Sequence, residues 1–351
     1  MVAALVGTFQ QKSPFEAEVS ESMRVGVIGT GRIGTLHARI LRDMGVETVV
    51  TDADTERARS LAVDLQIEAV GTVEELIERC DAIVITAATS AHAELIVAGV
   101  DARLPVFCEK PIALDLETTR QVVDHVTRKD GRVQIGFQRR FDPGFVAARD
   151  LVASGRLGTL FVVRMAGHDP DPPHEDYIPL SGGLFRDFSV HDFDALRFVT
   201  GEEVVEVYAT GSVREYPMFE KYGDIDTGVA TLTLESGALG ILSTTRRHPF
   251  GYDIRMELFG RDDSGVVGWD DRTPLRSLEP GGPAVPADPY RNFQDRFRRA
   301  YTDELAAFLE FARGERDNPC TVTDAERALA VAVACDISRA EHRPVRLEEV
   351  A

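Results

Sequence analysis

The chain has 351 residues, a length that suits two domains because single hydrophobic cores stop growing near about 250–300 residues. Hydrophobic residues make up 44% and charged residues 28%, which excludes a disordered or fibrous chain. The formal net charge of −19 argues against nucleic acid as a partner, since clustered Lys and Arg supply the affinity for phosphate backbones.

The cysteines and the apolar runs exclude further classes. The 4 cysteines lie far apart without a CxxC pair, which indicates reduced, buried thiols and neither a zinc site nor a disulfide framework. No apolar run reaches the ~18 residues of a membrane span, and the N-terminus lacks the basic and apolar segments of a signal peptide. These patterns predict a cytoplasmic protein with no metal and no membrane partner.

The first part of the chain alternates between strand-like and helix-like segments. Residues 1–22 show no sustained period, so we expect a mobile extension there. The expected strands that follow are residues 24–28, 47–51, 82–86, 105–108 and 133–137, and the expected helices are residues 33–43, 54–65, 90–100 and 115–129. Short Val- and Ile-rich runs between helices predict a parallel sheet covered on both faces, so we expect a doubly wound dinucleotide-binding domain over residues 23–140.

The pattern becomes richer in strands after residue 140. Expected strands are residues 160–166, 204–210, 229–234, 239–245 and 254–260, and expected helices lie near residues 143–153, 188–198, 293–313 and 323–339. Turn residues at 235–237 and 261–265 are typical of hairpins. Residues 141–351 are therefore predicted to form an α+β domain with an open, mainly antiparallel sheet, which serves substrate binding and oligomerisation.

A glycine motif, GTGRIG, follows the first expected strand directly and opens the first expected helix. Gly29 permits a tight turn, Gly31 lets the backbone approach a pyrophosphate, and Gly34 allows the helix to pack closely on the strand. Arg32 and Ile33 lie in the same first turn, where the helix dipole favours an anion. The alternative is a glycine-rich turn without a ligand.

Asp52 ends the second expected strand, about 20 residues after the central glycine. A carboxylate at this place accepts hydrogen bonds from the adenosine ribose hydroxyls and repels a 2′-phosphate, so NAD is favoured over NADP. The alternative is a surface aspartate in a turn. Arg57 and Arg59 lie downstream and could reach a phosphate, which leaves the strictness of the preference open.

Two further strand ends carry candidate cofactor contacts. Thr86 and Ala87 are small residues that let the backbone approach a ligand at the carboxyl end of a strand. His92 falls in the next helical turn, where a partly exposed helix histidine is the favoured interpretation over catalysis. After another strand come Glu109 and Lys110, and a lysine at such a position is poorly explained by packing because burying an unpaired ammonium is costly.

Asp187 and His191 stand four residues apart in an expected helix. That spacing puts carboxylate and imidazole on one face, one turn apart. Oxidation of an alcohol needs a base near neutral pH, and histidine suits that task. Alone, such a pair is more often a salt bridge or a solvated helix face.

Together these residues resemble the glucose–fructose oxidoreductase, inositol dehydrogenase and MocA family, from residue 23 to the C-terminus. The features that carry the resemblance are the glycine motif with His37 behind it, Asp52, residues 86–92, Glu109-Lys110-Pro111, residues 136–142, and Asp187 with His191. Within the family the chain is most similar to inositol 2-dehydrogenases, through residues 167–170, 250–253 and 293–301. It departs from them at Gln138 and Pro170, two positions that are expected to shape the polyol pocket.

The resemblance implies NAD-dependent oxidation of a ring hydroxyl of a cyclic polyol, with an inositol as the first choice. It implies that His191 is the general base, that Lys110 donates a hydrogen bond to the reacting oxygen, and that Asp187 orients substrate and base. Glu109 and Lys110 are expected to contact the cofactor as well. The expected substrate-binding residues are Gln138, Arg139, His168 and Tyr252.

Several alternatives stay open. Arg139 is also interpreted as a surface cation, His168 as a loop histidine and Tyr252 as a core tyrosine. The substrate is alternatively a pyranose sugar, an anhydrosugar or an aminocyclitol. A catalytically inactive NAD-sensing regulator is disfavoured because both Lys110 and His191 are present. Members of the family often associate through the open sheet, so a homodimer or homotetramer is expected.

Overall fold

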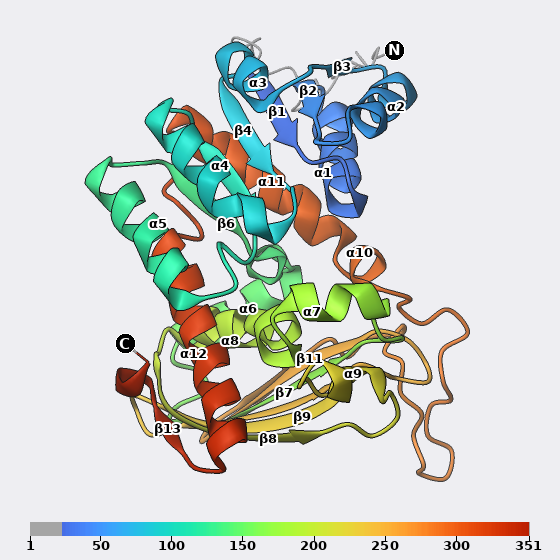
Figure 1. Cartoon of the computed structure of the whole chain (residues 1–351). Coiled ribbons are helices and arrows are strands. Elements are labelled where there is room, and N and C mark those ends of the chain that lie inside the picture. Colours follow the sequence, from blue (N-terminus) through green and yellow to red (C-terminus); the bar gives the residue numbers. More distant parts are fainter. Residues whose placement is uncertain (1–22, 351) are drawn as a thin grey trace, which may run out of the picture.

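The computed structural model describes residues 23–350, which form two β-sheets connected and flanked by helices (Figure 1). The extension expected over residues 1–22 lies outside the described residues. Within the part described, no helix is long and apolar enough to cross a membrane. All four cysteines are buried and free, as the sequence predicts.

The first sheet consists of six parallel strands in the spatial order β3-β2-β1-β4-β5-β6. Its strands are β1 (Arg24–Ile28), β2 (Glu47–Thr51), β3 (Glu68–Ala69), β4 (Ala82–Ile85), β5 (Val106–Glu109) and β6 (Val133–Gly136). The connecting helices are α1 (Arg32–Asp43), α2 (Thr55–Leu65), α3 (Val73–Arg79), α4 (Thr89–Asp101) and α5 (Leu116–Arg128). Strands β1 and β4 are buried over nearly their whole length because helices cover both faces, so the doubly wound prediction is confirmed.

The strand order reverses between β1 and β4. In open parallel sheets, ligands bind at the carboxyl ends of the two strands that flank such a reversal. The turns that follow β1 and β4 meet here, where the Thr86 hydroxyl donates a 2.7 Å hydrogen bond to the carbonyl oxygen of Gly29. The topology alone therefore directs the search for a site to this edge of the sheet.

The second sheet has seven strands in the order β12-β11-β7-β10-β9-β8-β13. They are β7 (Leu160–His168), β8 (Val204–Ser212), β9 (Thr227–Leu234), β10 (Leu239–Thr245), β11 (Asp253–Gly260), β12 (Ser264–Val267) and β13 (Val345–Arg346). All neighbours pair antiparallel except β7 and β10, which are parallel, so the mainly antiparallel prediction is confirmed. Buried and exposed residues alternate along β9 and β10, because helices cover one face of this sheet.

The remaining helices lie between and beside the sheets. They are α6 (Pro143–Ala153), α7 (Ile178–Ser181), α8 (Val190–Thr200), α9 (Met218–Lys221), α10 (Phe293–Arg296), α11 (Arg298–Arg313) and α12 (Val322–Glu341), with a π-helical turn at Phe185–Ser189 that leads into α8. Helix α11 follows the second sheet in sequence but returns to the first, where Phe308 packs edge-on against Phe107 of β5 at 5.6 Å between ring centroids. Helix α12 contacts α5 and β8, so the end of the chain joins the two sheets.

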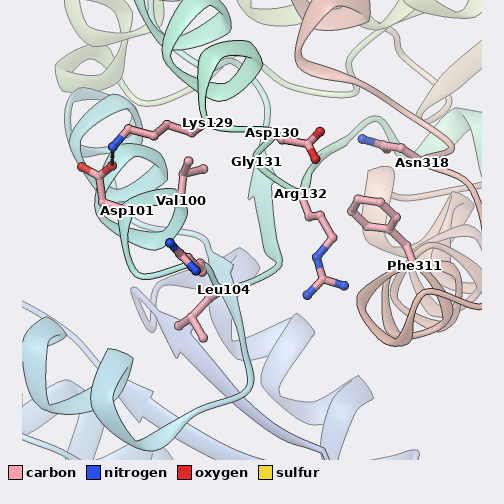
Figure 2. Close-up of a pocket in the computed structure, with 10 residues that line it drawn as sticks. Val100, Asp101, Leu104, Lys129, Asp130, Gly131, Arg132, Phe311 and Asn318 are labelled. Carbon is pink, nitrogen blue, oxygen red and sulfur yellow. Dashed lines mark ion pairs between the residues drawn. The ribbon is translucent and has the colours of Figure 1, made fainter.

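A cavity of about 720 Å³ opens at the amino ends of β5 and β6 (Figure 2). It is lined by residues 100–104 and 129–132 together with Phe311 and Asn318, where helices α4, α5 and α11 end. Basic side chains at such helix ends interact with the last carbonyl groups, as Arg132 does with the carbonyl oxygen of Ala312 at 3.0 Å. The cavity lies at the opposite end of the strands from the glycine motif and is separate from the site described next.

Candidate active site

The glycine motif forms the turn between β1 and α1. Gly29 has φ +95°, and a Cβ atom there would lie 2.6 Å from the backbone of Ala87. A side chain on Gly34 would overlap the carbonyl oxygen of Gly29, whereas a Cβ on Gly31 would meet no heavy atom within 4 Å. Gly31 caps α1, and the first turn contains no acidic residue. The first backbone N–H groups of α1 therefore face open space at Gly31. A pyrophosphate binds to N–H groups of this kind, so these residues fit NAD.

The two other residues of the motif lie at the edge of this turn. The Arg32 guanidinium is exposed and lies over the Phe293 ring at 4.8 Å from its centroid. Ile33 is partly buried in the first turn of α1. Arg32 and Ile33 are the first residues of α1, so their backbone N–H groups, rather than their side chains, face the space next to Gly31.

Asp52 lies at the end of β2 with its carboxylate turned back toward the glycine turn. Oδ2 accepts hydrogen bonds from the Thr30 amide at 2.6 Å and from the Thr30 hydroxyl at 2.9 Å. Oδ1 accepts from the Asp54 amide at 2.8 Å, and Arg57 donates to both oxygens. Burial raises the pKa of Asp52, but the hydrogen bonds from Arg57, Thr30 and Asp54 outweigh it and lower the value to about 2.

His92 lies in the first turn of α4 and is 2% exposed, so the interpretation as a partly exposed helix histidine is wrong. Its Nδ1 is 2.8 Å from the carbonyl oxygen of Pro111, and its Nε2 is 3.0 Å from that of Ala87. Burial lowers the pKa of His92. The ring thus links the turn after β4 to the segment after β5 and holds both beside the glycine motif.

Glu109 ends β5 and contacts helix α1. Its Oε1 lies 2.6 Å from Nε2 of His37, a fully buried histidine on the face of α1 that packs on the sheet. The His37 ring also meets Phe107 and Tyr301 edge-on. This contact fixes the end of β5, and therefore the start of the Lys110 segment, relative to the helix that begins at the glycine motif.

Lys110 reaches from the first sheet to the π-helical turn before α8. Its Nζ donates to the main-chain oxygen of Asp187 at 2.7 Å and lies 3.5 Å from Oδ1 of the same residue. Both side chains are mostly buried. A π-helical turn is rare and often occurs at functional sites. The hydrogen bond to the main-chain oxygen and the nearby carboxylate offset part of the cost of burying the ammonium.

Asp187 is also bound by two groups that the sequence did not bring to attention. Arg246 Nη2 donates to Oδ2 at 2.8 Å, and the Tyr177 hydroxyl donates to Oδ1 at 2.9 Å. Arg246 Nη1 holds Asp169 at 3.1 Å, so one guanidinium bridges two carboxylates. Burial raises the pKa of Asp187, but the charges of Lys110 and Arg246 outweigh it, so its pKa lies below the usual range. Burial raises the pKa of Asp169 to about 6 despite Arg246.

His191 lies in the first turn of α8, next to Lys110. Its ring meets Phe137 edge-on at 5.7 Å, and its Nδ1 atom is buried without a hydrogen-bond partner among the described residues. Burial lowers the pKa of His191 well below its usual value, and the positive charges of Lys110 and Arg139 lower it further. The carboxylate of Asp187, four residues earlier, bonds to Arg246 and Tyr177 instead. The imidazole is therefore neutral at physiological pH.

Arg139 is fully buried, so the interpretation as a surface cation is wrong. Its Nη1 forms an ion pair with the buried carboxylate of Asp192. The guanidinium lies 6.0 Å from the centroid of the Phe145 ring and 5.9 Å from that of Phe297. Its Nε and Nη2 atoms are buried without a hydrogen-bond partner among the described residues. Tyr252 also lies against this guanidinium. Burial lowers the pKa of Arg139, but the charge of Asp192 together with Tyr252 outweighs it and raises the pKa.

Gln138 and Tyr252 are also buried. Gln138 begins a 3₁₀ turn that follows β6. The Tyr252 ring packs edge-on against Phe188 and Phe297, and burial raises the pKa of its hydroxyl. Tyr252 is surrounded by buried aromatic rings, which agrees with its interpretation as a core tyrosine.

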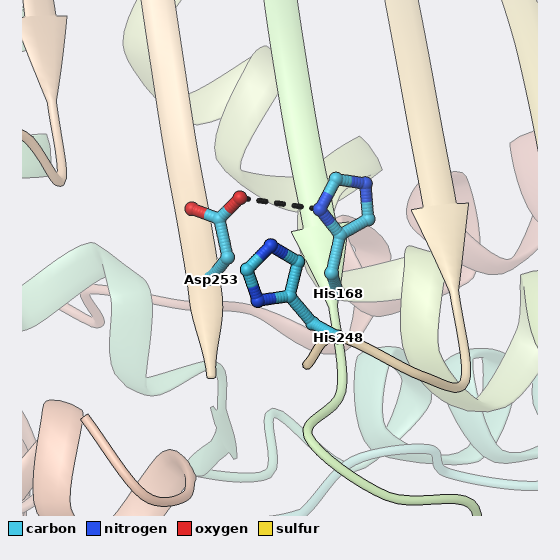
Figure 3. Close-up of side chains that lie close together, drawn as sticks. All are labelled: His168, His248 and Asp253. Atoms are coloured by element: carbon cyan, nitrogen blue, oxygen red, sulfur yellow. Dashed lines mark hydrogen bonds and ion pairs between the residues drawn. The ribbon is translucent and has the colours of Figure 1, made fainter. Parts of the chain in front are cut away.

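His168 is the last residue of β7 rather than part of a loop, which corrects the loop interpretation. Its Nδ1 is 3.2 Å from Oδ2 of Asp253 and its Nε2 is 3.2 Å from the Ser243 hydroxyl, while its ring stacks on His248 at 5.7 Å (Figure 3). Two imidazoles and a carboxylate come within 4.8 Å of one another here. Arg255 binds both oxygens of Asp253, so that carboxylate is already neutralised.

Arg246, Asp169 and Tyr177 are the members of this cluster that the sequence analysis missed. Arg246 follows β10 directly, and β10 lies parallel to β7, which ends at His168. A cation at the carboxyl end of a strand is the same signal that identified Lys110, so Arg246 was open to prediction. Tyr177 lies in a short irregular segment and carries no such signal.

The fold and this site define the class of the protein as an NAD-dependent oxidoreductase. The glycine turn and the Asp52 carboxylate lie at the carboxyl ends of β1 and β2, and the paired lysine lies after the carboxyl end of β5, beside a neutral histidine. Residues 23–137 match the model of the oxidoreductase family with an NAD-binding Rossmann fold, and residues 145–264 match that of the GFO/IDH/MocA C-terminal domain. The chain belongs to the Gfo/Idh/MocA family, the family that its sequence motifs resemble.

The similarity to known proteins extends over nearly the whole chain. The chain is 38% identical over 335 residues to the myo-inositol 2-dehydrogenase of Thermotoga maritima. The aligned region covers 93% of this chain and 99% of that protein. The chain is 32% identical to the scyllo-inositol 2-dehydrogenase (NAD(+)) of Bacillus subtilis, with coverage of 94% and 98%. The structure matches that of scyllo-inositol dehydrogenase from Lactobacillus casei with bound NAD(H) and scyllo-inositol, with a TM-score of 0.84, 26% identity and coverage of 93% and 100%.

Proposed function

We propose that the protein oxidises a ring hydroxyl of a cyclic polyol, with an inositol as the first choice, and uses NAD as the hydride acceptor. One observation carries this proposal: the Lys110 ammonium is held against Asp187 beside a neutral His191, after the carboxyl end of β5, two strands from the strand that leads into the glycine turn. The names of the similar proteins, myo- and scyllo-inositol 2-dehydrogenase, support the substrate class.

Lys110 and His191 have different roles at the reacting hydroxyl. Lys110 donates a hydrogen bond to the substrate oxygen and stabilises the negative charge that develops on it. His191 accepts the hydroxyl proton, and because Nδ1 is buried, Nε2 is the nitrogen that does so. The bound NAD supplies the acceptor for the hydride. Asp187 keeps the lysine in place and stays ionised because of the positive charges of Lys110 and Arg246.

The wall of the site offers groups for the remaining hydroxyls of a ring. We propose that Gln138, Arg139, His168 and Tyr252 contact the substrate. The imidazole of His168, which lies at the end of β7 and is partly exposed, supports this assignment. We propose that Gln138 and Pro170, where the sequence departs from the inositol 2-dehydrogenases that it resembles, influence which polyol is accepted.

We further propose that the uncovered face of the second sheet joins copies of the chain into a dimer or tetramer. Large apolar side chains are exposed on neighbouring strands of this face: Phe161, Tyr208, Val229, Leu239 and Ile241. Contiguous apolar surface of this kind marks protein interfaces. Such an interface would also protect the sheet from nonspecific association.

A panel of substrates tests the proposed reaction. Purified protein is incubated with NAD and myo-inositol, scyllo-inositol, glucose, an anhydrosugar or an aminocyclitol, and NADH formation is followed by its absorbance. The proposal predicts the highest kcat/KM with an inositol. Binding of NAD without reduction by any compound of the panel would favour a sensor that lacks catalysis.

A further inference from the structure

The carboxylate of Asp52 has no hydrogen-bonding capacity left. Two carboxylate oxygens offer about four lone-pair sites. Five donor contacts already occupy them: the amide and hydroxyl of Thr30, the amide of Asp54, and Nε and Nη2 of Arg57 at 3.2 and 2.6 Å. Asp52 is only 7% exposed, so no free side of the carboxylate faces solvent. Ribose hydroxyls can bond to Asp52 only if one of these donors leaves.

Arg57 is the donor that can leave. The contacts from Thr30 and Asp54 include backbone amides fixed by the turns after β1 and β2, whereas Arg57 reaches Asp52 with a long flexible side chain from α2. That side chain is 52% exposed, and within the described residues its hydrogen bonds go to Asp52 alone. Because about half of the Arg57 side chain is exposed, its guanidinium can move from Asp52 into solvent without becoming a buried, unpaired cation.

We propose that Arg57 is a specificity-determining residue that competes with the adenosine ribose for Asp52 and supplies the cation that a 2′-phosphate requires. Toward NAD it acts as a competitor, because the ribose hydroxyls must displace it. Toward NADP it acts as a partner, because a guanidinium released from Asp52 binds a phosphate through two parallel hydrogen bonds. The carboxylate therefore discriminates less sharply against NADP than an unpaired aspartate would.

Direct binding measurements test this role without a polyol and without turnover. NADH and NADPH are titrated by calorimetry into the wild-type protein, Arg57→Ala and Arg59→Ala. The sequence also made Arg59 a candidate phosphate contact, but in the structure it is exposed on the same helix and pairs with Glu56 rather than Asp52, so it is a matched control. For Arg57→Ala we expect the Kd of NADH to fall about threefold and that of NADPH to rise about tenfold, whereas Arg59→Ala shifts both Kd values less than about twofold.

Arg57→Lys provides a second, milder variant. It keeps the positive charge but cannot bond both carboxylate oxygens at once, so the ratio of the NADPH to the NADH Kd should fall between those of the wild type and Arg57→Ala. A rise in that ratio of at least about threefold in Arg57→Ala supports the proposal. A smaller rise, or an equal rise in Arg59→Ala, overturns it. Because no polyol is present, this outcome is independent of the proposed substrate.

Discussion

Nζ of Lys110 donates a 2.7 Å hydrogen bond to the main-chain oxygen of Asp187, 77 residues later in the chain, and stands 3.5 Å from the carboxylate of the same residue. The contact joins the end of β5 to the π-helical turn that leads into α8. It holds an ammonium beside the His191 imidazole without forming a tight ion pair. The lysine keeps donors available for a substrate oxygen.

Lys110→Met should remove the group that stabilises the developing alkoxide. We expect kcat to fall by about 10²–10³, the cost of removing one donor to such an oxygen, while the Kd of NADH changes little. Lys129→Met is the control, because Lys129 is exposed, pairs with Asp101 and lies at the opposite end of the strands. Steady-state kinetics and NADH titration measure both quantities. Retained turnover in Lys110→Met would contradict the assigned role.

Arg246→Lys should disturb the position of Asp187 without removing charge. A lysine cannot bridge Asp187 and Asp169 as the guanidinium does, so we expect kcat to fall about 10–100-fold with a smaller change in KM. Arg247→Lys, at the exposed neighbouring position, is the control and should stay near wild type. A merely structural role would instead lower the melting temperature and leave the kcat of the folded protein unchanged.

The pH dependence of kcat/KM should follow the neutral state of His191. Burial lowers the pKa of this base well below the usual value of 6.5, so its unprotonated form persists as the pH falls from 8 to 6.5. We therefore expect a flat profile over this range and a loss of activity only at lower pH. The profile is measured with saturating NAD. An acidic limb centred above the usual histidine pKa would exclude His191 as the base.

Glu304 should make folding less stable as the pH rises. It is fully buried on α11, neither carboxylate oxygen has a hydrogen-bond partner among the described residues, and burial raises its pKa well above 4.5. An acid whose folded pKa is raised stabilises the fold below its unfolded pKa, and this contribution is lost as the pH rises toward the folded pKa. Glu304→Gln should thus stabilise the protein at about pH 8 by roughly 1–3 kcal/mol.

The control for this prediction is Glu310→Gln, on the same helix, whose carboxylate is exposed and pairs with Arg316. Thermal unfolding of both variants is compared at about pH 8 and about pH 5. The gain in Glu304→Gln should shrink at the lower pH, because the free energy needed to keep the buried wild-type carboxyl protonated falls as the pH approaches its unfolded pKa of 4.5. An equal gain at both values would mean that packing, rather than charge, sets the difference.

Ile241→Arg should break the proposed contact between copies of the chain. Ile241 is exposed at the middle of β10 on the uncovered sheet face, and a buried arginine without a partner opposes association. Light scattering after size exclusion should show an oligomer for the wild type and a smaller species for Ile241→Arg. Val63→Arg, on the exposed side of α2, should leave the mass unchanged. A monomeric wild type would contradict the proposal.

Much of the fold follows from local patterns in the sequence. Val- and Ile-rich runs placed the long strands of the first sheet to within about two residues, and the glycine spacing placed the turn between β1 and α1. The short β3 and α3 were missed, because two strand residues and a seven-residue helix carry too little periodicity. Helix α11 was predicted, but an apolar helix face does not say which sheet it will cover.

The site was predictable only where each residue carries its own signal. Lys110 stands at a strand end, and Asp187 and His191 have helical spacing, but that spacing alone favoured a salt bridge, and the family resemblance made the pair candidates for catalysis. The roles of Arg139 and Arg246 depend on partners from distant segments, Asp192 for the first and Asp187 with Asp169 for the second. When such arginines are buried, they pair with carboxylates from distant segments instead of facing solvent. Only the tertiary structure shows that they are buried.

A crystal structure of the protein with NADH and myo-inositol tests the central claim most directly. The account predicts that one hydroxyl oxygen lies within about 3.2 Å of both Nζ of Lys110 and Nε2 of His191, with its carbon facing the nicotinamide. An inositol bound with neither side chain at its hydroxyl, or one located away from the nicotinamide, would contradict the account.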